Sequence, residues 1–336
     1  MPLNADDLAL SPPSAWNMNK AESDWLVAYA WLEKRRRHAP PNADVWHLRF
    51  HWPQRGEALY RQVCGGVYRL QPMQVHHYRD RSWVQWCAQD ALVLKWVALQ
   101  VEDKLPRHER CAHLRGRGGG KQSVNEVWQA LSSEEYTFVY RTDIRGYYRH
   151  IRKAQVLSQV RWHVDDPVLV GLIEQYLYYS VEDAGEFYTP EHGICRGCAL
   201  SPLIGGSLLH HVDSYFSTME GTFYARYMDD FVLLTRSRWQ LRRCVKRLHE
   251  FFNLGGFEAH PDKTQLGRIE HGFDWLGVWF TLAGTTIAPR ALENHRARRM
   301  RLYEQARRQG LSVTETEARV QTYEARWKIW ATWILV

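Results

Sequence analysis

Tyr227-Met228-Asp229-Asp230 places two adjacent carboxylates between two apolar, β-rich runs. The runs at 222–226 and 231–235 predict two strands, and the acidic pair predicts the tight turn between them. Adjacent carboxylates at a hairpin tip repel each other unless a cation lies between them, and their hard oxygens suit Mg²⁺. Surface turns commonly carry Asp-Asp and bind nothing, so the pair alone does not establish a metal site.

A third carboxylate, Asp143, follows a predicted central strand at 136–140. Joined to Asp229 and Asp230, it would complete a site for two Mg²⁺ ions that bridge a triphosphate and a 3′-hydroxyl. A lone Asp at a strand end is usually a helix cap or a turn former. The order and context of the three carboxylates therefore carry the prediction.

The composition indicates a chain with ample core and a modest excess of positive charge. Its 336 residues allow one large domain or two to three modest ones, and its 44 basic against 37 acidic residues favour a polyanionic partner. Six irregularly spaced cysteines are typical of reduced thiols. The N-terminus is polar and acidic, and no apolar run approaches the ~20 residues of a membrane span. We therefore expect a cytoplasmic protein without a membrane partner.

Hydrophobic periodicity and chain breakers predict a mixed order of elements. They are a helix near 20–38, a helix over 83–102, the strand at 136–140, a helix with Ser201 as its N-cap, a helix through 241–252 that Gly255-Gly256 ends, a strand pair around 273–280, and helix from 288 with a break at Gly310. This order predicts an α+β core followed by an all-α C-terminal piece.

Six segments carry patterns that occur together in one protein family. In chain order they are 113–121, 142–148, 193–203, 227–230, 260–264 and 273–277. They resemble the fingers motif and motifs A to E of reverse transcriptases, specifically a compact bacterial form akin to the group II intron enzymes, without maturase or endonuclease domains. The resemblance covers about residues 50–285.

The resemblance implies a right-hand polymerase fold with antiparallel sheet and helices in fingers and palm. The implied regions are an N-terminal extension at 1–50, fingers at 51–130, palm at 131–285 and a short all-α thumb at 286–336. It implies an RNA-directed DNA polymerase that adds dNTPs to a primer 3′ end on an RNA template, with Mg²⁺ or Mn²⁺ as cofactor.

The resemblance also implies roles for individual residues. Asp143, Asp229 and Asp230 would be catalytic and, with Ile144, would hold the metal ions. Lys263 would donate a proton to the leaving pyrophosphate or neutralise its charge. Tyr148 would be a steric gate that rejects a ribose 2′-hydroxyl. The remaining substrate-binding residues would be Arg115, Arg117, Lys121, Arg196 and Gly197.

Motif B departs from the family pattern. Relatives usually have Pro-Gln before the glycine, whereas this chain has Cys195-Arg196-Gly197. Arg196 would instead meet a template phosphate or stack on a base. Cys195 and Cys198 also form a C-x-x-C with His192 nearby, but no second ligand pair follows at zinc-site spacing. Small residues at a tight loop are the alternative to zinc or redox chemistry.

Several alternatives stay open at this stage. Six arginines near the C-terminus would either contact the backbone of a template–primer duplex or form a solvated helix face. They are Arg296, Arg298, Arg299, Arg301, Arg307 and Arg308. Rival functions are an RNA-dependent RNA polymerase and an RNA-binding, maturase-like or assembly protein. A role in a mobile genetic element or in antiphage defence, a dedicated non-coding RNA as partner, and the oligomeric state are not separable from the sequence.

Overall fold

The computed structural model describes residues 19–78 and 81–335, so residues 1–18 of the expected N-terminal extension lie outside it. The helices are α1 (Lys20–Arg35), α2 (Asp44–Cys64), α3 (Ala88–Val101), α4 (Gly119–Ser132), α5 (Tyr147–His150), α6 (Lys153–His163), α7 (Pro167–Leu177), α8 (Ser201–Leu208), α9 (His210–Ser217), α10 (Arg238–Gly255), α11 (Pro289–Arg308) and α12 (Val313–Ile334). The strands are β1 (Met73–Tyr78), β2 (Arg81–Gln85), β3 (Phe138–Asp143), β4 (Val181–Asp183), β5 (Glu186–Tyr188), β6 (Thr222–Tyr227), β7 (Asp230–Thr235), β8 (Gln265–Arg268), β9 (Phe273–Trp275), β10 (Val278–Thr281) and β11 (Gly284–Ile287). Two 3₁₀ turns, η1 (Pro261–Lys263) and η2 (Ile269–His271), flank β8. The expected α+β class is confirmed.

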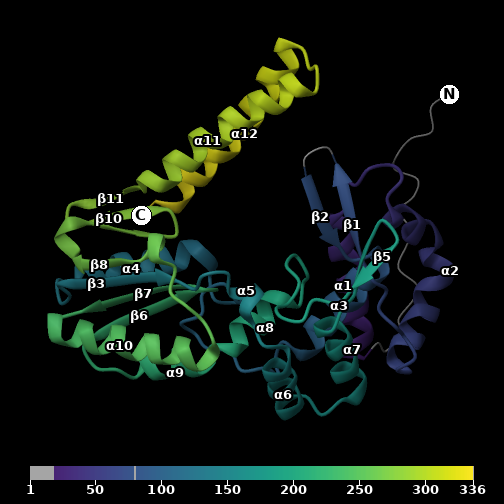
Figure 1. Cartoon of the computed structure of the whole chain (residues 1–336), viewed down its shortest axis with the longest axis horizontal. Coiled ribbons are helices and arrows are strands. Elements are labelled where there is room, and N and C mark those ends of the chain that lie inside the picture. The colour runs from purple at the N-terminus through teal and green to yellow at the C-terminus, as the bar shows by residue number, and fades with distance from the viewer. Residues whose placement is uncertain (1–18, 79–80, 336) are drawn as a thin grey trace.

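The strands form three sheets. The central sheet has the order β6-β7-β3-β8 and is antiparallel throughout. A second sheet, β11-β10-β9, lies beside it, and a third, β2-β1-β4-β5, belongs to the N-terminal half, where β1 and β4 pair in parallel. In Figure 1, α5 and α8 lie between the central sheet and the N-terminal helices.

The central sheet is buried on both faces, which fixes its register. Along β7, Phe231 and Leu233 pack into one apolar cluster with α10, whereas Val232 and Leu234 pack into another with α4 and β9. Alternate side chains of a strand point to opposite faces, so a one-residue slip would exchange the two sets. Helices α9 and α10 accordingly lie on one side of the sheet and α4 on the other (Figure 1).

The C-terminal helices form a hairpin that projects from the small sheet (Figure 1). Gly310 adopts a positive φ of 66° between α11 and α12, as the break expected there requires. At its far end α12 returns to the core, where Ile334 is buried among α4 and β9 residues. No helix of the described residues is long and apolar enough to cross a membrane.

Two local expectations were wrong. The segment 83–85 is not helical, because it pairs with β1 as part of β2, and the helix begins only at Ala88 after Cys87 caps it. Ser201 is not an N-cap: it is already the first residue of α8, and its hydroxyl donates to the Cys195 carbonyl at 2.7 Å. An N-cap residue precedes the first helical residue, and that position belongs to Leu200.

The loop between β5 and α8 passes close under α5. Gly193 has a φ of 80°, and its N–H donates to the Ile151 carbonyl at 3.0 Å. A Cβ at Gly193 would lie 2.7 Å from the Tyr148 carbonyl oxygen and 2.9 Å from the Arg149 Cα. A Cβ at Gly197, which has a φ of 79°, would meet nothing within 4 Å.

We therefore expect Gly193→Ala to destabilise the protein clearly more than Gly197→Ala. Both substitutions carry the left-handed backbone penalty of about 1–2 kcal/mol, but only the first adds a clash with backbone atoms. Urea unfolding of the two variants against the wild type measures the difference. Equal losses of unfolding free energy would contradict the close approach of this loop to α5.

Candidate active site

The β6–β7 hairpin closes with a two-residue turn. Tyr227 pairs with Asp230 across the strands, so only Met228 and Asp229 lie in the turn. Asp230 is therefore the first residue of β7. The sequence pattern had predicted that both carboxylates lie in the turn, and this was wrong for Asp230. Met228 has a φ of 58°, in the left-handed region that residues other than glycine rarely adopt.

The register of the central sheet brings the three predicted carboxylates together. Asp143 is the last residue of β3 and lies directly opposite Asp230 on β7. The N–H of Ile144 donates to the Asp229 carbonyl at 3.1 Å, which ties the turn to the end of β3. Side chains directly opposite in an antiparallel pair have Cβ atoms about 4.5–5.5 Å apart, and like charges there destabilise the sheet.

Two cations reduce that repulsion. Arg141 donates to the Asp230 carboxylate at 3.1 Å, and the ammonium group of Lys263 pairs with Asp143. Arg141 also donates to the Lys263 carbonyl at 2.7 Å, which fixes the η1 turn beside the carboxylates. Sequence reasoning missed Arg141, although it stands two residues before Asp143 and therefore on the same face of the strand.

Ionisation of Asp230 and Asp229 is disfavoured where they lie. Burial raises the pKa of Asp230 to about 6; Asp229 and Asp143 add to the shift and Arg141 opposes it. Burial also raises the pKa of Asp229, with a contribution from Asp143 and opposition from Lys263 and Arg196. The ends of β3 and β7 thus hold more negative charge than the neighbouring side chains neutralise.

The carboxylate oxygens at the ends of β3 and β7 are of the type that a divalent cation takes as ligands. The Oδ1 atom of Asp143 is buried and has no hydrogen-bond partner, which is costly for a carboxylate oxygen unless a cation or donor meets it. Ile144 could contribute only its main-chain oxygen, because its side chain is buried in the core. As arranged here, no three His, Cys, Asp or Glu side chains within residues 19–78 and 81–335 converge closely enough to hold an ion. Lys263 and Arg141 hold two of the carboxylates instead.

Tyr148 lies over the turn. Its hydroxyl donates to the Met228 Sδ at 3.9 Å. A Cβ at Gly205 of α8 would lie 3.4 Å from the Tyr148 ring, so the absence of a side chain there makes room for the ring. Burial raises the pKa of the Tyr148 hydroxyl, which keeps it protonated.

The other predicted substrate residues are spread more widely. Arg196 and its neighbour Gly197 are exposed, and the charge of Arg196 lowers the pKa of both Tyr148 and Asp229, against the larger effect of burial. Arg115 is an exposed side chain that pairs with Glu102 at 3.4 Å, and Arg117 is exposed in the same loop. Lys121 points elsewhere and donates to the Leu335 carbonyl at 2.5 Å, at the end of α12.

The C-x-x-C pair has protein partners. Cys195 and Cys198 are both buried, and their sulfur atoms accept hydrogen bonds from the Trp86 ring at 3.2 Å and the Leu200 N–H at 3.4 Å. His192 is exposed. These contacts match the interpretation of the cysteines as small residues in a tight loop.

The raised pKa of Asp230 predicts that, in a chelating buffer, the wild type loses about 2 kcal/mol of stability relative to Asp230→Asn between pH 4 and pH 7.5. The folded-state pKa of about 6 exceeds the ordinary 3.8, so this carboxyl contributes stability at low pH and loses that contribution as the pH rises through 6. Asparagine removes this pH dependence, and it leaves the Arg141 guanidinium without its anionic partner at both pH values.

Thermal unfolding at both pH values measures the effect. Asp262→Asn, at an exposed position of η1, is the matched control and should change little. A stability difference between the wild type and Asp230→Asn that stays the same at pH 4 and pH 7.5 would contradict the raised pKa of Asp230.

Comparisons with known proteins identify the family. The family described as reverse transcriptase (RNA-dependent DNA polymerase) matches residues 99–280, more than half of the chain. Similar solved structures include apo telomerase from Candida tropicalis truncated from its C-terminal domain, at 11% identity and a TM-score of 0.45, covering 59% of this chain and 45% of that one. Telomerase from Candida albicans in complex with a fragment of telomeric RNA matches at 13% identity and a TM-score of 0.45, covering 60% and 38%.

This chain thus spans less than half the length of those telomerase structures. The sequence matches none of the curated proteins compared with it. The family match contains the hairpin of Asp229 and Asp230, the strand of Asp143 and the turn of Lys263. The chain belongs to the reverse transcriptase (RNA-dependent DNA polymerase) family.

Proposed function

We propose that this chain is an RNA-directed DNA polymerase that adds dNTPs to a nucleic-acid 3′ end on an RNA template. The observation that carries the proposal is the meeting of Asp143, Asp229 and Asp230 at the joined ends of β3 and β7, within the matched family region. Three carboxylates that crowd each other are typical of a site built for divalent cations.

The carboxylates and the main-chain oxygen of Ile144 would hold the metal ions, with Mg²⁺ preferred by such hard ligands. When bound, two such ions lower the pKa of the attacking hydroxyl and stabilise the pyrophosphate leaving group. Lys263 stands next to Asp143 and would neutralise charge on the leaving group. Arg141 holds both Asp230 and the turn of Lys263 in place.

Tyr148 would select the sugar. Its ring lies between the Met228 side chain and α8, where it can exclude a 2′-hydroxyl from a bound nucleotide. Arg196, exposed beside this ring, would meet a template phosphate or base. Arg115 and Arg117 would contact the triphosphate from the loop before α4, and Lys121 would have to leave Leu335 to join them.

The regions of a right-hand polymerase map onto the chain as fingers at 51–130, palm at 131–285 and thumb at 286–336, after an N-terminal extension. The hairpin of α11 and α12 would hold the template–primer duplex through the exposed arginines of α11. One of these, Arg299, is paired with Glu324 at 3.0 Å and contributes less net charge. Lys and Arg contacts to phosphates would make binding strongly salt-dependent.

The setting we propose is that of a compact bacterial enzyme akin to group II intron reverse transcriptases, in a mobile element or in antiphage defence. A dedicated non-coding RNA is the proposed template. Sequencing the RNA that copurifies with the protein, together with its cDNA, tests this. One co-encoded RNA would favour it, and mixed cellular RNA would favour a general polymerase.

Replacing both Asp229 and Asp230 by alanine should reduce dNTP incorporation by at least about 1000-fold, because the metal ligands are lost. Primer extension on an RNA template measures this, with Asp262→Ala as a surface control.

Running the wild type with dNTPs and NTPs separately tests the rival function of an RNA polymerase, which would prefer NTPs. Retained synthesis in the double variant would overturn the mechanism, and RNA binding with no synthesis by the wild type would favour the maturase-like alternative.

A further inference from the structure

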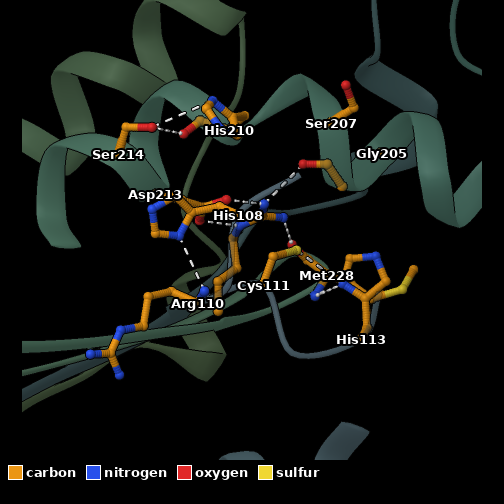
Figure 2. Close-up of polar contacts among 12 residues, drawn as sticks. His108, Arg110, Cys111, His113, Gly205, Ser207, His210, Asp213, Ser214 and Met228 are labelled. Carbon is orange, nitrogen blue, oxygen red and sulfur yellow. Dashed lines mark hydrogen bonds and ion pairs between the residues drawn. The ribbon is translucent and has the colours of Figure 1, made fainter. Parts of the chain in front are cut away.

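Met228, the residue before Asp229, is held through both of its peptide groups. Its N–H donates to the His113 Nδ1 at 3.0 Å, as Figure 2 shows. Its carbonyl accepts from the Arg226 guanidinium at 2.8 Å. Because the φ of 58° is unfavourable for a methionine, these outside contacts select the turn conformation.

The tautomer and orientation of His113 are set by its second contact. Its Nε2 lies 3.1 Å from the Pro202 carbonyl oxygen, which can only accept. Nε2 therefore carries the hydrogen and Nδ1 is left as an acceptor for Met228. A Cβ at Gly206 of α8 would lie 3.2 Å from two atoms of the ring, so the ring packs tightly against the helix. Burial lowers the pKa of His113 to about 4, which keeps the imidazole neutral at neutral pH.

Main-chain bonds place His113 beside the turn. The N–H of Arg226 donates to the Arg110 carbonyl, and the N–H of Ala112 donates to the Arg226 carbonyl, both at 2.9 Å. Cys111 thereby forms a parallel bridge with Arg226. The segment before α4 is thus tied to the last residues of β6, and His113 follows directly.

Arg226 is fully buried, and each of its three side-chain nitrogens donates a hydrogen bond. It donates to the two carboxylate oxygens of Asp213 at 2.7 and 2.5 Å and to the Gly206 carbonyl at 2.9 Å. The Tyr224 hydroxyl adds a hydrogen bond to Asp213 at 2.7 Å. Asp213 of α9 and Gly206 of α8 fix the plane of the guanidinium group. Its Nη1 atom therefore points at the Met228 carbonyl.

We propose that His113 and Arg226 are positioning residues that clamp Met228 and thereby set the carboxylates of the turn for catalysis. The inference rests on the proposed role of Asp229 and Asp230. Apolar residues of similar volume usually stabilise a core as well as a buried ion pair does. A contribution to stability alone therefore does not explain why the charged pair of Arg226 and Asp213 lies in the core. The hydrogen bond from Arg226 to the Met228 carbonyl does explain it.

Two substitutions of His113 separate its hydrogen bonds to Met228 and Pro202, while its Nδ1 also lies 3.4 Å from the Cys111 Sγ. Asparagine places an acceptor oxygen near the position of Nδ1 and can still receive the Met228 N–H. Glutamine places a donor near Nε2 and can still reach Pro202. We expect His113→Gln to lose about 100-fold in kcat, the scale of an ångström-sized misplacement, and His113→Asn to keep most of it, with unchanged Kd for template–primer in both.

Steady-state primer extension, template–primer binding and thermal unfolding of both variants make the test. Equal losses of kcat in the two variants, or losses that follow Tm, would assign His113 a merely structural role and overturn the inference. Loss of binding without loss of kcat would overturn it as well.

Arg226 is tested together with its partner, because Arg226→Met alone leaves Asp213 buried and unpaired. The triple variant Arg226→Met/Asp213→Leu/Tyr224→Phe removes both charges and the buried hydroxyl that donates to Asp213, so it should unfold near the wild-type temperature. It should still lose kcat, since nothing donates to the Met228 carbonyl. Wild-type kcat in this folded variant would contradict the clamp. If instead the proposed function is wrong, a different result follows: the variant Asp229→Ala/Asp230→Ala extends primers as well as the wild type does.

Discussion

The repulsion between Asp143 and Asp230, opposite each other at the joined ends of β3 and β7, is the constraint on which the rest of the site depends. A sheet does not place two carboxylates in register without compensation. Arg141 and Lys263 supply part of it through ion pairs, yet burial, with smaller contributions from Asp229 and Asp143, keeps the pKa of Asp230 near 6, and one Asp143 oxygen remains without a partner. The residual negative charge is what a divalent cation would bind.

Holding such a site open requires rigidity around it. The central sheet is buried on both faces, so the strand ends that carry the carboxylates cannot shift without moving two apolar clusters. The turn has no such packing, and Met228 adopts an unfavourable backbone conformation. Its peptide groups are instead bonded by Arg226, which Asp213 orients, and by His113, which Pro202 orients. Backbone strain and buried charge are thus concentrated at the β6–β7 turn, as is common at functional sites.

Local patterns predicted most of the fold. Two apolar, β-rich runs on either side of the acidic pair located the β6–β7 hairpin, and the spacing of Leu241, Leu248 and Phe252 located α10. The strand β2 was missed because its apolar residues run on into those of α3 without a strong breaker. Partners far apart in sequence could not be predicted: Lys121 meets Leu335 only because α12 folds back to α4. His113 and Asp213 likewise reach the turn from distant elements, although a charged Arg226 inside an apolar strand was a usable signal.

The central claim is that the ends of β3 and β7 form one divalent-cation site when template–primer is bound. Titration of Mn²⁺ into the protein–template–primer complex, followed by electron paramagnetic resonance, tests it most directly. The account predicts that Asp143→Asn abolishes the tightest Mn²⁺ binding, whereas Asp262→Asn at the exposed η1 position leaves it intact. Equal Mn²⁺ affinity in the wild type and Asp143→Asn would contradict it.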